Sequence, residues 1–170
     1  KKILEENKSI DIFLSISIDG DTETHNKIRK KDNAFKNALT TIEELSKLSK
    51  KNKRLSVGVN STYIGSNYKS LCKLYKELYS VKLNYVSLNL VRGNTWNNRP
   101  KEININEYNQ LCVLKDKLIN SMNNESSLMN SLMASKGHLM TKLITETFKK
   151  DISVNDCYAG SLFGVIKDNG

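Results

Sequence analysis

The stretch "DIFLSISIDG", residues 11–20, decides the fold class. Apolar residues alternate along it with small or polar ones, which is the period of a β-strand, and the alternation stops at Asp19-Gly20. The apolar set is Ile12, Leu14, Ile16 and Ile18, and the alternating set is Asp11, Phe13, Ser15, Ser17 and Asp19. We therefore predict a strand over 11–19 with one apolar and one largely polar face.

Two later stretches repeat this pattern, "RLSVGVNST" (54–62) and "NYVSLNLVR" (84–92). Between the strand-like stretches, apolar residues three and four positions apart predict helices over about 33–51 and 66–80. The order strand, helix, strand, helix, strand is typical of βαβ units. It predicts an α/β fold with a parallel sheet and right-handed crossovers.

Small and polar residues occupy one face of all three predicted strands, among them Gly58, Asn60 and Ser87. A parallel sheet covered by helices on both faces would show nearly continuous apolar runs instead. The alternation favours a partial (β/α) barrel whose apolar face meets outer helices. Its polar face would line a lumen, where the small residues leave room for a polar ligand. An antiparallel sheet with one face in water is the alternative.

Polar side chains also mark the carboxyl ends of the predicted strands, where barrel proteins carry their ligand sites. They are Ser17, Asp19, Asn60, Asn89 and Arg92. Such groups bind hydroxyls, amines or a carboxylate, but they do not make a nucleophile and base pair. "GSNYKS" (65–70) is a loop with a helix cap rather than a phosphate-binding loop. The pattern indicates a binding surface for a reactive cofactor.

His25 and Arg29 follow the first strand four residues apart, the spacing that places two side chains on one helix face. We expect Asp19 and Gly20 to form a turn, Arg29 to pair with a nearby carboxylate, and His25 to be a neutral structural residue. Alternatively, the Arg29 guanidinium binds a cofactor carboxylate over the strand ends. For His138, on a predicted helix, we expect a surface or core position.

The remaining sequence predicts a loop after Gly93, a helix capped by Asn106 and running to about Asn123, and a helix over about 128–150. "SLFGVIK" (161–167) predicts the first arm of a β-hairpin, and the first ten residues predict the end of a helix. We expect a half-barrel over 1–123, a helical linker over 124–152, and the start of another region over 153–170.

Three cysteines, at 72, 112 and 157, are too few and too widely spaced for a disulfide framework or a self-contained zinc site. Cys72 and Cys112 lie on apolar helical stripes, which predicts buried thiols. Cys157 lies in a turn-rich passage and is the candidate metal ligand.

The chain of 170 residues carries 27 basic against 18 acidic residues, a net charge of +9. This excess raises the question of a nucleic-acid partner, but the lysines are scattered and lack interleaved aromatics, so a solvated surface explains the charge as well. No apolar run approaches the ~20 residues of a membrane helix, and the first residues do not resemble a signal peptide. We expect a cytoplasmic protein.

The stretch "SISIDGDTETHNKIRKKDNAFKNALTTIEEL" (15–45) resembles the fourth strand and following helix of radical S-adenosylmethionine enzymes. In that family a strand ending in Ser-x-Asp-Gly precedes a His, an Arg and an amphipathic helix. "NDCYAGSLFGVIKDNG" (155–170) is similar to the start of the SPASM or twitch region, which holds an auxiliary iron–sulfur cluster. The two landmarks stand in the family's order.

The resemblance implies a partial barrel that binds S-adenosylmethionine and a [4Fe-4S] cluster and generates a 5′-deoxyadenosyl radical. It implies that Ser17 contacts the cofactor and that Cys157 binds an auxiliary cluster. Asn60 and Asn89 correspond by topology, at the ends of the next two strands, and we expect Asp19 and Arg29 to contact the cofactor as well. Such enzymes commonly modify a peptide or protein. The family's Cys-x-x-x-Cys-x-x-Cys motif and its glycine-rich motif are absent from the chain.

We therefore expect an internal fragment that binds no cofactor alone. The three-cysteine motif would lie roughly a hundred residues upstream, by the ~30-residue size of a βα unit. Two other hypotheses stay open. One is a half-barrel binding module without chemistry, whose exposed strand edges favour a homo-oligomer. The other is a nucleic-acid-binding domain.

Overall fold

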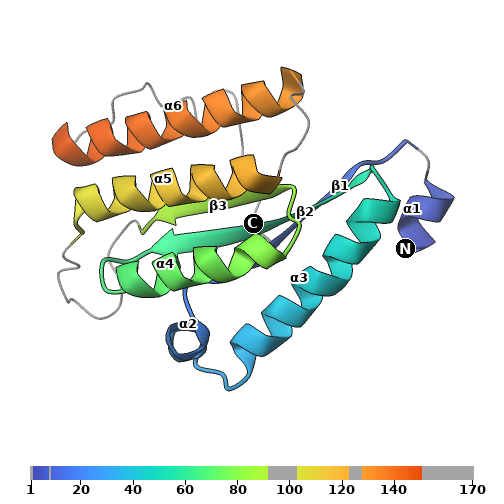
Figure 1. Ribbon diagram of the computed structural model, residues 1–170, viewed down its shortest axis with the longest axis horizontal. Coiled ribbons are helices and arrows are strands. Elements are labelled where there is room, and N and C mark those ends of the chain that lie inside the picture. Colours follow the sequence, from blue (N-terminus) through green and yellow to red (C-terminus); the bar gives the residue numbers. More distant parts are fainter. Residues whose placement is uncertain (1, 8, 92–102, 123–127, 151–170) are drawn as a thin grey trace, which may run out of the picture.

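A computed structural model describes residues 2–7, 9–91, 103–122 and 128–150 (Figure 1). Helices and strands alternate as the sequence predicts. The elements are α1 (Lys2–Glu6), β1 (Ile12–Ser17), α2 (Thr22–Arg29), α3 (Ala34–Lys51), β2 (Leu55–Tyr63), α4 (Tyr68–Glu77), the 3₁₀ helix η1 (Leu78–Ser80), β3 (Tyr85–Leu90), α5 (Ile105–Met122) and α6 (Leu128–Lys150).

The three strands form one parallel sheet in the order β1-β2-β3. Ser17 of β1 pairs with Asn60 of β2, and Asn60 in turn pairs with Ser87 of β3. The prediction of an α/β fold with a parallel sheet is confirmed, and the antiparallel alternative is wrong.

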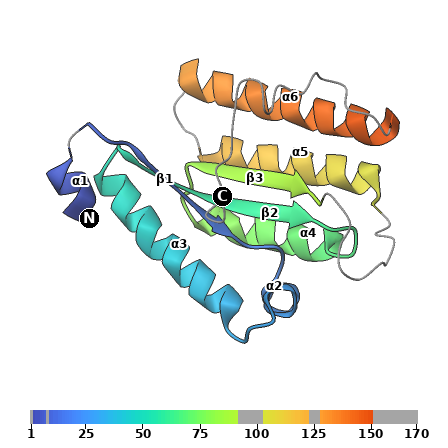
Figure 2. The same ribbon diagram turned by 180° about the vertical axis from the view of Figure 1, so that it is seen from behind.

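The helices that contact the sheet, α3, α4 and α5, lie on one of its two faces. Because each strand lies next to the preceding one, crossovers of the same hand bring the connecting helices to the same side. Helix α3 contacts β1 and β2, α4 contacts β2, and α5 contacts β3. In Figure 1, α4 lies in front of the strands, and in Figure 2, seen from behind, the strands lie in front of α4.

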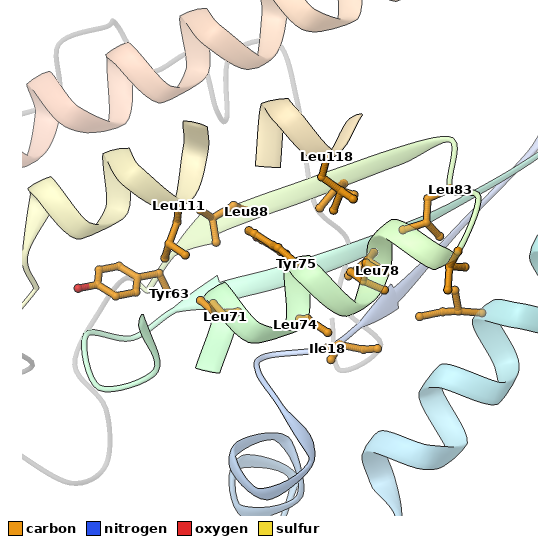
Figure 3. Close-up of a cluster of buried hydrophobic side chains, with 14 of the residues drawn as sticks. Ile18, Tyr63, Leu71, Leu74, Tyr75, Leu78, Leu83, Leu88, Leu111 and Leu118 are labelled. Carbon is orange, nitrogen blue, oxygen red and sulfur yellow. The ribbon is translucent and has the colours of Figure 1, made fainter. Parts of the chain in front are cut away.

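The helices pack on the apolar side of the strands and form one core with it (Figure 3). Fully buried contributors from the strands and helices include Val57, Val59, Leu71, Leu74, Leu111 and Leu118. Burying one such side chain contributes about 1.5–3 kcal/mol, so this face supplies most of the free energy that holds helices to sheet. On the opposite face Phe13 is 68% exposed. We call this second side of the sheet the open face.

Helix ends differ from the prediction in one respect. Asn106 is not the cap of α5, because the Oδ1 atom of Asn104 accepts from the N–H groups of Asn106 (3.0 Å) and Glu107 (3.4 Å). The helix therefore begins one residue before Asn106, at Ile105. Capping residues accept from the second or third N–H that follows, which fits Asn104.

Three further side-chain predictions can be compared with the structure. Cys112 is buried on α5 and Cys72 is half-buried on α4, and both are free thiols. His138 is exposed on α6, one of the two positions expected for it. Cys157, the predicted hairpin and the region 153–170 lie outside the described residues. Within the described ranges, no helix is long and apolar enough to cross a bilayer.

Candidate functional site

Ser17, Asn60, Ser87 and Asn89 lie together on the open face at the carboxyl ends of the strands, and we call them the strand-end row. The first three are neighbours in register, and Asn89 is the register partner of Thr62, one step further along the sheet. The period of two places them opposite the buried core residues. The sequence-predicted residues Ser17, Asn60 and Asn89 are thus brought together.

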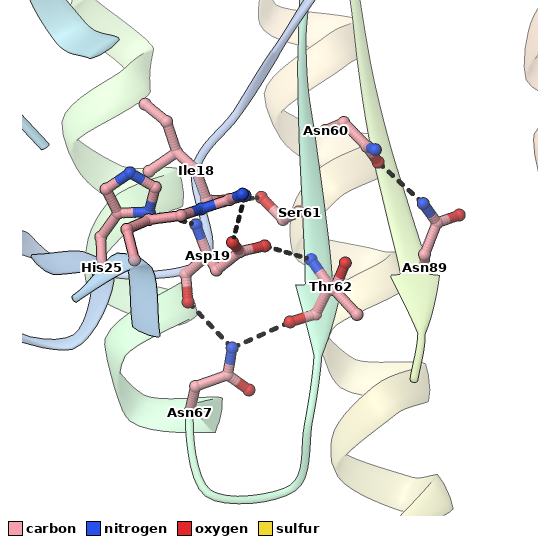
Figure 4. Close-up of polar contacts among 9 residues, drawn as sticks. Ile18, Asp19, His25, Asn60, Ser61, Thr62, Asn67 and Asn89 are labelled. Carbon is pink, nitrogen blue, oxygen red and sulfur yellow. Dashed lines mark hydrogen bonds and ion pairs between the residues drawn. The ribbon is translucent and has the colours of Figure 1, made fainter. Parts of the chain in front are cut away.

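Between residues that the structure describes, one side-chain hydrogen bond is found in the strand-end row. Asn89 donates from Nδ2 to Oδ1 of Asn60 at 2.9 Å, as Figure 4 shows. Ser17 and Asn89 are exposed, and Asn60 and Ser87 are half-buried. Along β1, β2 and β3, the residues whose side chains face this way carry no charge. The row can bind hydroxyls and neutral nitrogen groups.

Asp19, two residues beyond Ser17, lies in a different environment. It is 6% exposed, and its carboxylate accepts from the Thr62 N–H at 3.0 Å and from Arg29 at 2.7 Å (Figure 4). The first bond joins the end of β1 to β2, and the second holds α2 against the strand. Asp19 therefore stabilises the loop that follows β1. Arg29 pairs with a carboxylate, as predicted.

Asn67 completes the connection between the two strand ends. Its Nδ2 donates to the carbonyl oxygens of Asp19 and Thr62, both at 2.9 Å, and its Oδ1 accepts from the Ile64 N–H at 2.9 Å. It stands at the N-cap position of α4 but makes no side-chain cap bond. The "GSNYKS" loop therefore contains the N-cap residue of α4, as predicted, but the Asn67 side chain turns back to the strands and does not cap the helix.

His25 lies on the same face of α2 as Arg29 and closes the loop from the other side. Its Nδ1 accepts from the Asp19 N–H at 3.1 Å, and the side chain is 2% exposed, with its ring edge-on to Phe35. Burial lowers the pKa of His25, and Arg29 adds to this while Asp19 opposes it. The imidazole is neutral, as predicted. We call Asp19, His25, Arg29 and Asn67 the loop cluster.

The loop continues into α2 through a close approach at Gly20. Its φ is +152°, and a Cβ there would meet the Ser70 hydroxyl and lie 3.0 Å from Cβ of Thr24. Ser70 accepts from the Asp21 N–H at 2.6 Å and donates to Oδ1 of Asp21 at 2.8 Å. Burial raises the pKa of Asp21, but hydrogen bonds from Ser70, Thr24 and Lys73 outweigh it and lower that pKa to about 2.

Sequence reasoning missed Tyr85, which lies on the open face one row before Asn60 and Ser87. The period of two that located Ser87 and Asn89 would have located Tyr85 as well. The interpretation that Gly58 leaves room on this face is wrong, because a Cβ on Gly58 would lie 2.6 Å from Cζ of the Tyr85 ring. That space is occupied by the ring.

Among the residues that the structure describes, no group of three or more His, Cys, Asp or Glu side chains could hold a metal ion. Cys72 and Cys112 lie on the helices of the core, away from the open face. The predicted cluster ligand Cys157 is outside the described residues. The described residues thus form an accessible polar surface without a metal-ligand set.

A scan against models of protein families finds no match to this chain, and a search of curated protein sequences finds none either.

Proposed function

We propose that this chain is part of a radical S-adenosylmethionine enzyme, with β1, β2 and β3 as part of its barrel. The observation that carries the proposal is the strand-end row, an uncharged set of hydroxyl and amide groups at the carboxyl ends of parallel strands. The helices on the opposite face fit the same architecture, since a barrel places its helices outside and its ligand at the strand ends.

S-adenosylmethionine fits the chemistry of the strand-end row. Ribose hydroxyls and adenine nitrogens are neutral donors and acceptors, which Ser17, Asn60 and Asn89 can match. Arg29 is 43% exposed at its side chain, so part of its guanidinium remains available to a carboxylate beside its bond to Asp19. Asp19 itself is not retained as a cofactor contact, because both of its oxygens already accept hydrogen bonds.

An iron–sulfur cluster does not fit the described residues, which lack a suitable cysteine set. The proposal therefore requires cluster ligands outside the described ranges, Cys157 among them for an auxiliary cluster. When bound, S-adenosylmethionine and a reduced cluster supply hydrogen-atom abstraction from the substrate, which we propose to be a peptide or protein. This chain's residues bind and orient the nucleoside part, and the loop cluster fixes the strand ends that carry them.

The proposal is tested on the whole protein, including any sequence that flanks these 170 residues. Iron and acid-labile sulfide are measured after anaerobic purification, and S-adenosylmethionine binding is measured by calorimetry. We expect both iron–sulfur content and binding. A protein that binds S-adenosylmethionine without iron or sulfide would be a binding module, and a protein that does neither would contradict the proposal.

A further inference from the structure

Tyr85 and Gly58 are register partners on the open face, one row before the strand-end row. A Cβ placed on Gly58 would lie 2.5 Å from Cδ2 and 2.6 Å from Cζ of the tyrosine ring. Real Cβ atoms do not approach other atoms so closely, because van der Waals contact between carbons begins near 3.5 Å. The ring therefore extends from β3 over β2 and fills the position that any side chain at residue 58 would need.

Backbone conformation does not explain the glycine at this position. Positive φ angles among the described glycines occur at Gly20 and Gly65, and not at Gly58. Gly58 lies inside β2, where a glycine forgoes side-chain packing and often marks a close approach by another group. Here the group that approaches closely is the Tyr85 ring. Residue 58 is a glycine because a Cβ would overlap that ring.

The ring is a partly exposed aromatic surface on a face that is otherwise small and polar at this level. Tyr85 is half-buried, and its neighbours on the face are Ser15 in its own row and Asn60 and Ser87 in the next. Planar heterocycles stack on tyrosine rings, and the contact contributes beyond its buried area. An aromatic ring beside an uncharged row of amides and hydroxyls is suited to a nucleoside.

We propose that Tyr85 is a cofactor-binding residue, whose ring over Gly58 forms the floor on which the adenine of S-adenosylmethionine stacks. The inference depends on the proposed function, since it takes the strand-end row as the site that binds the ribose and the base edge. It adds a residue outside that row and a reason for the glycine beneath it.

The two positions allow a test in which the ring is either removed or displaced. S-adenosylmethionine affinity is measured by anaerobic calorimetry on the whole protein and on its Tyr85→Leu, Tyr85→Phe and Gly58→Ala variants. Tyr85→Leu removes the ring, whereas Gly58→Ala leaves the tyrosine in the chain and forces the ring aside. Ser56→Ala is the matched control, because Ser56 lies on the same strand and face two residues before Gly58.

We expect Tyr85→Leu and Gly58→Ala to weaken binding by up to about tenfold, the scale of one aromatic contact. Tyr85→Phe keeps the ring and should bind as the unsubstituted protein does, as should Ser56→Ala. The double variant Gly58→Ala with Tyr85→Leu should bind no more weakly than either single variant, because both changes remove the same contact. A cooperative thermal unfolding transition is measured for each variant to confirm that it is folded.

The outcomes separate the two proposals. If the unsubstituted protein does not bind S-adenosylmethionine, the proposed function is contradicted and the role of Tyr85 falls with it. If the unsubstituted protein binds S-adenosylmethionine and the folded Gly58→Ala variant binds it equally well, the proposed contact between Tyr85 and the adenine is contradicted while the proposed function stands. Should Tyr85→Leu not fold, Gly58→Ala and its control still decide. Additive losses in the double variant also overturn the shared contact.

Discussion

The loop cluster and the strand-end row lie at the same edge of the sheet, yet their polar groups are used differently. In the loop cluster, both carboxylate oxygens of Asp19 and both amide atoms of Asn67, Oδ1 and Nδ2, form hydrogen bonds within the protein, and both residues are buried. In the strand-end row, the bond between Asn60 and Asn89 joins two partly or fully exposed side chains. Polar residues at strand ends are therefore not equivalent, and burial separates structural from available groups.

Removing a member of the loop cluster should have the largest effect on stability. Asn67→Ala leaves the Ile64 N–H and the carbonyls of Asp19 and Thr62 without this partner in a region that is 1% exposed at Asn67. At roughly 1 kcal/mol for each group, we expect a loss of about 3 kcal/mol in the free energy of unfolding. Chemical denaturation measures it, and a loss below about 1 kcal/mol would mean that Asn67 does not join the strand ends.

Asp19 should follow with a somewhat smaller effect. Asp19→Ala deprives the Thr62 N–H and Arg29 of their acceptor, but Arg29 is 43% exposed and regains water. We expect a loss of about 2 kcal/mol. Asp19→Asn keeps an acceptor for Thr62 and should lose about half as much. Equal losses in the two variants would show that the bond to Thr62 contributes nothing.

His25 should make stability depend on pH in the acid range. Its pKa in the folded protein is lowered from 6.5, chiefly by burial, so the unfolded chain binds a proton that the folded protein does not. The stabilisation is complete above 6.5 and is lost as the pH falls toward the folded pKa.

Unfolding free energies measured from about pH 7 to about pH 5 should fall less steeply for His25→Gln than for the unsubstituted protein. Glutamine can still accept from the Asp19 N–H but does not titrate there. Parallel slopes would contradict a buried, neutral His25.

The strand-end row should show the smallest effect on stability. Asn60→Ala and Asn89→Ala remove one hydrogen bond between accessible side chains. We expect losses within about 0.5 kcal/mol, as for surface substitutions. A loss comparable with that of Asn67→Ala would place the row with the loop cluster and remove the distinction between them.

The period of two in "DIFLSISID" and its two repeats, together with the helical spacing between them, was sufficient to predict the parallel sheet and which face meets the helices. The same period placed Ser17 and Asn60 at the carboxyl ends of their strands, but it did not give the register that makes them neighbours. It could not show that Asp19 is buried, because its burial depends on contacts with Thr62 and Arg29. Both residues lie outside the strand that contains the alternation, and Thr62 is distant from Asp19 in sequence. The ring of Tyr85 over Gly58 depends on a side-chain rotamer, which alternation does not encode.

The binding of S-adenosylmethionine to the Asn60→Ala variant tests the central claim most directly. If the strand-end row holds the nucleoside, this variant should bind about threefold to tenfold more weakly than the unsubstituted protein, the scale of one hydrogen bond, while its unfolding free energy changes by no more than about 0.5 kcal/mol. Equal affinities in the two folded proteins would contradict the claim that the row is the ligand site.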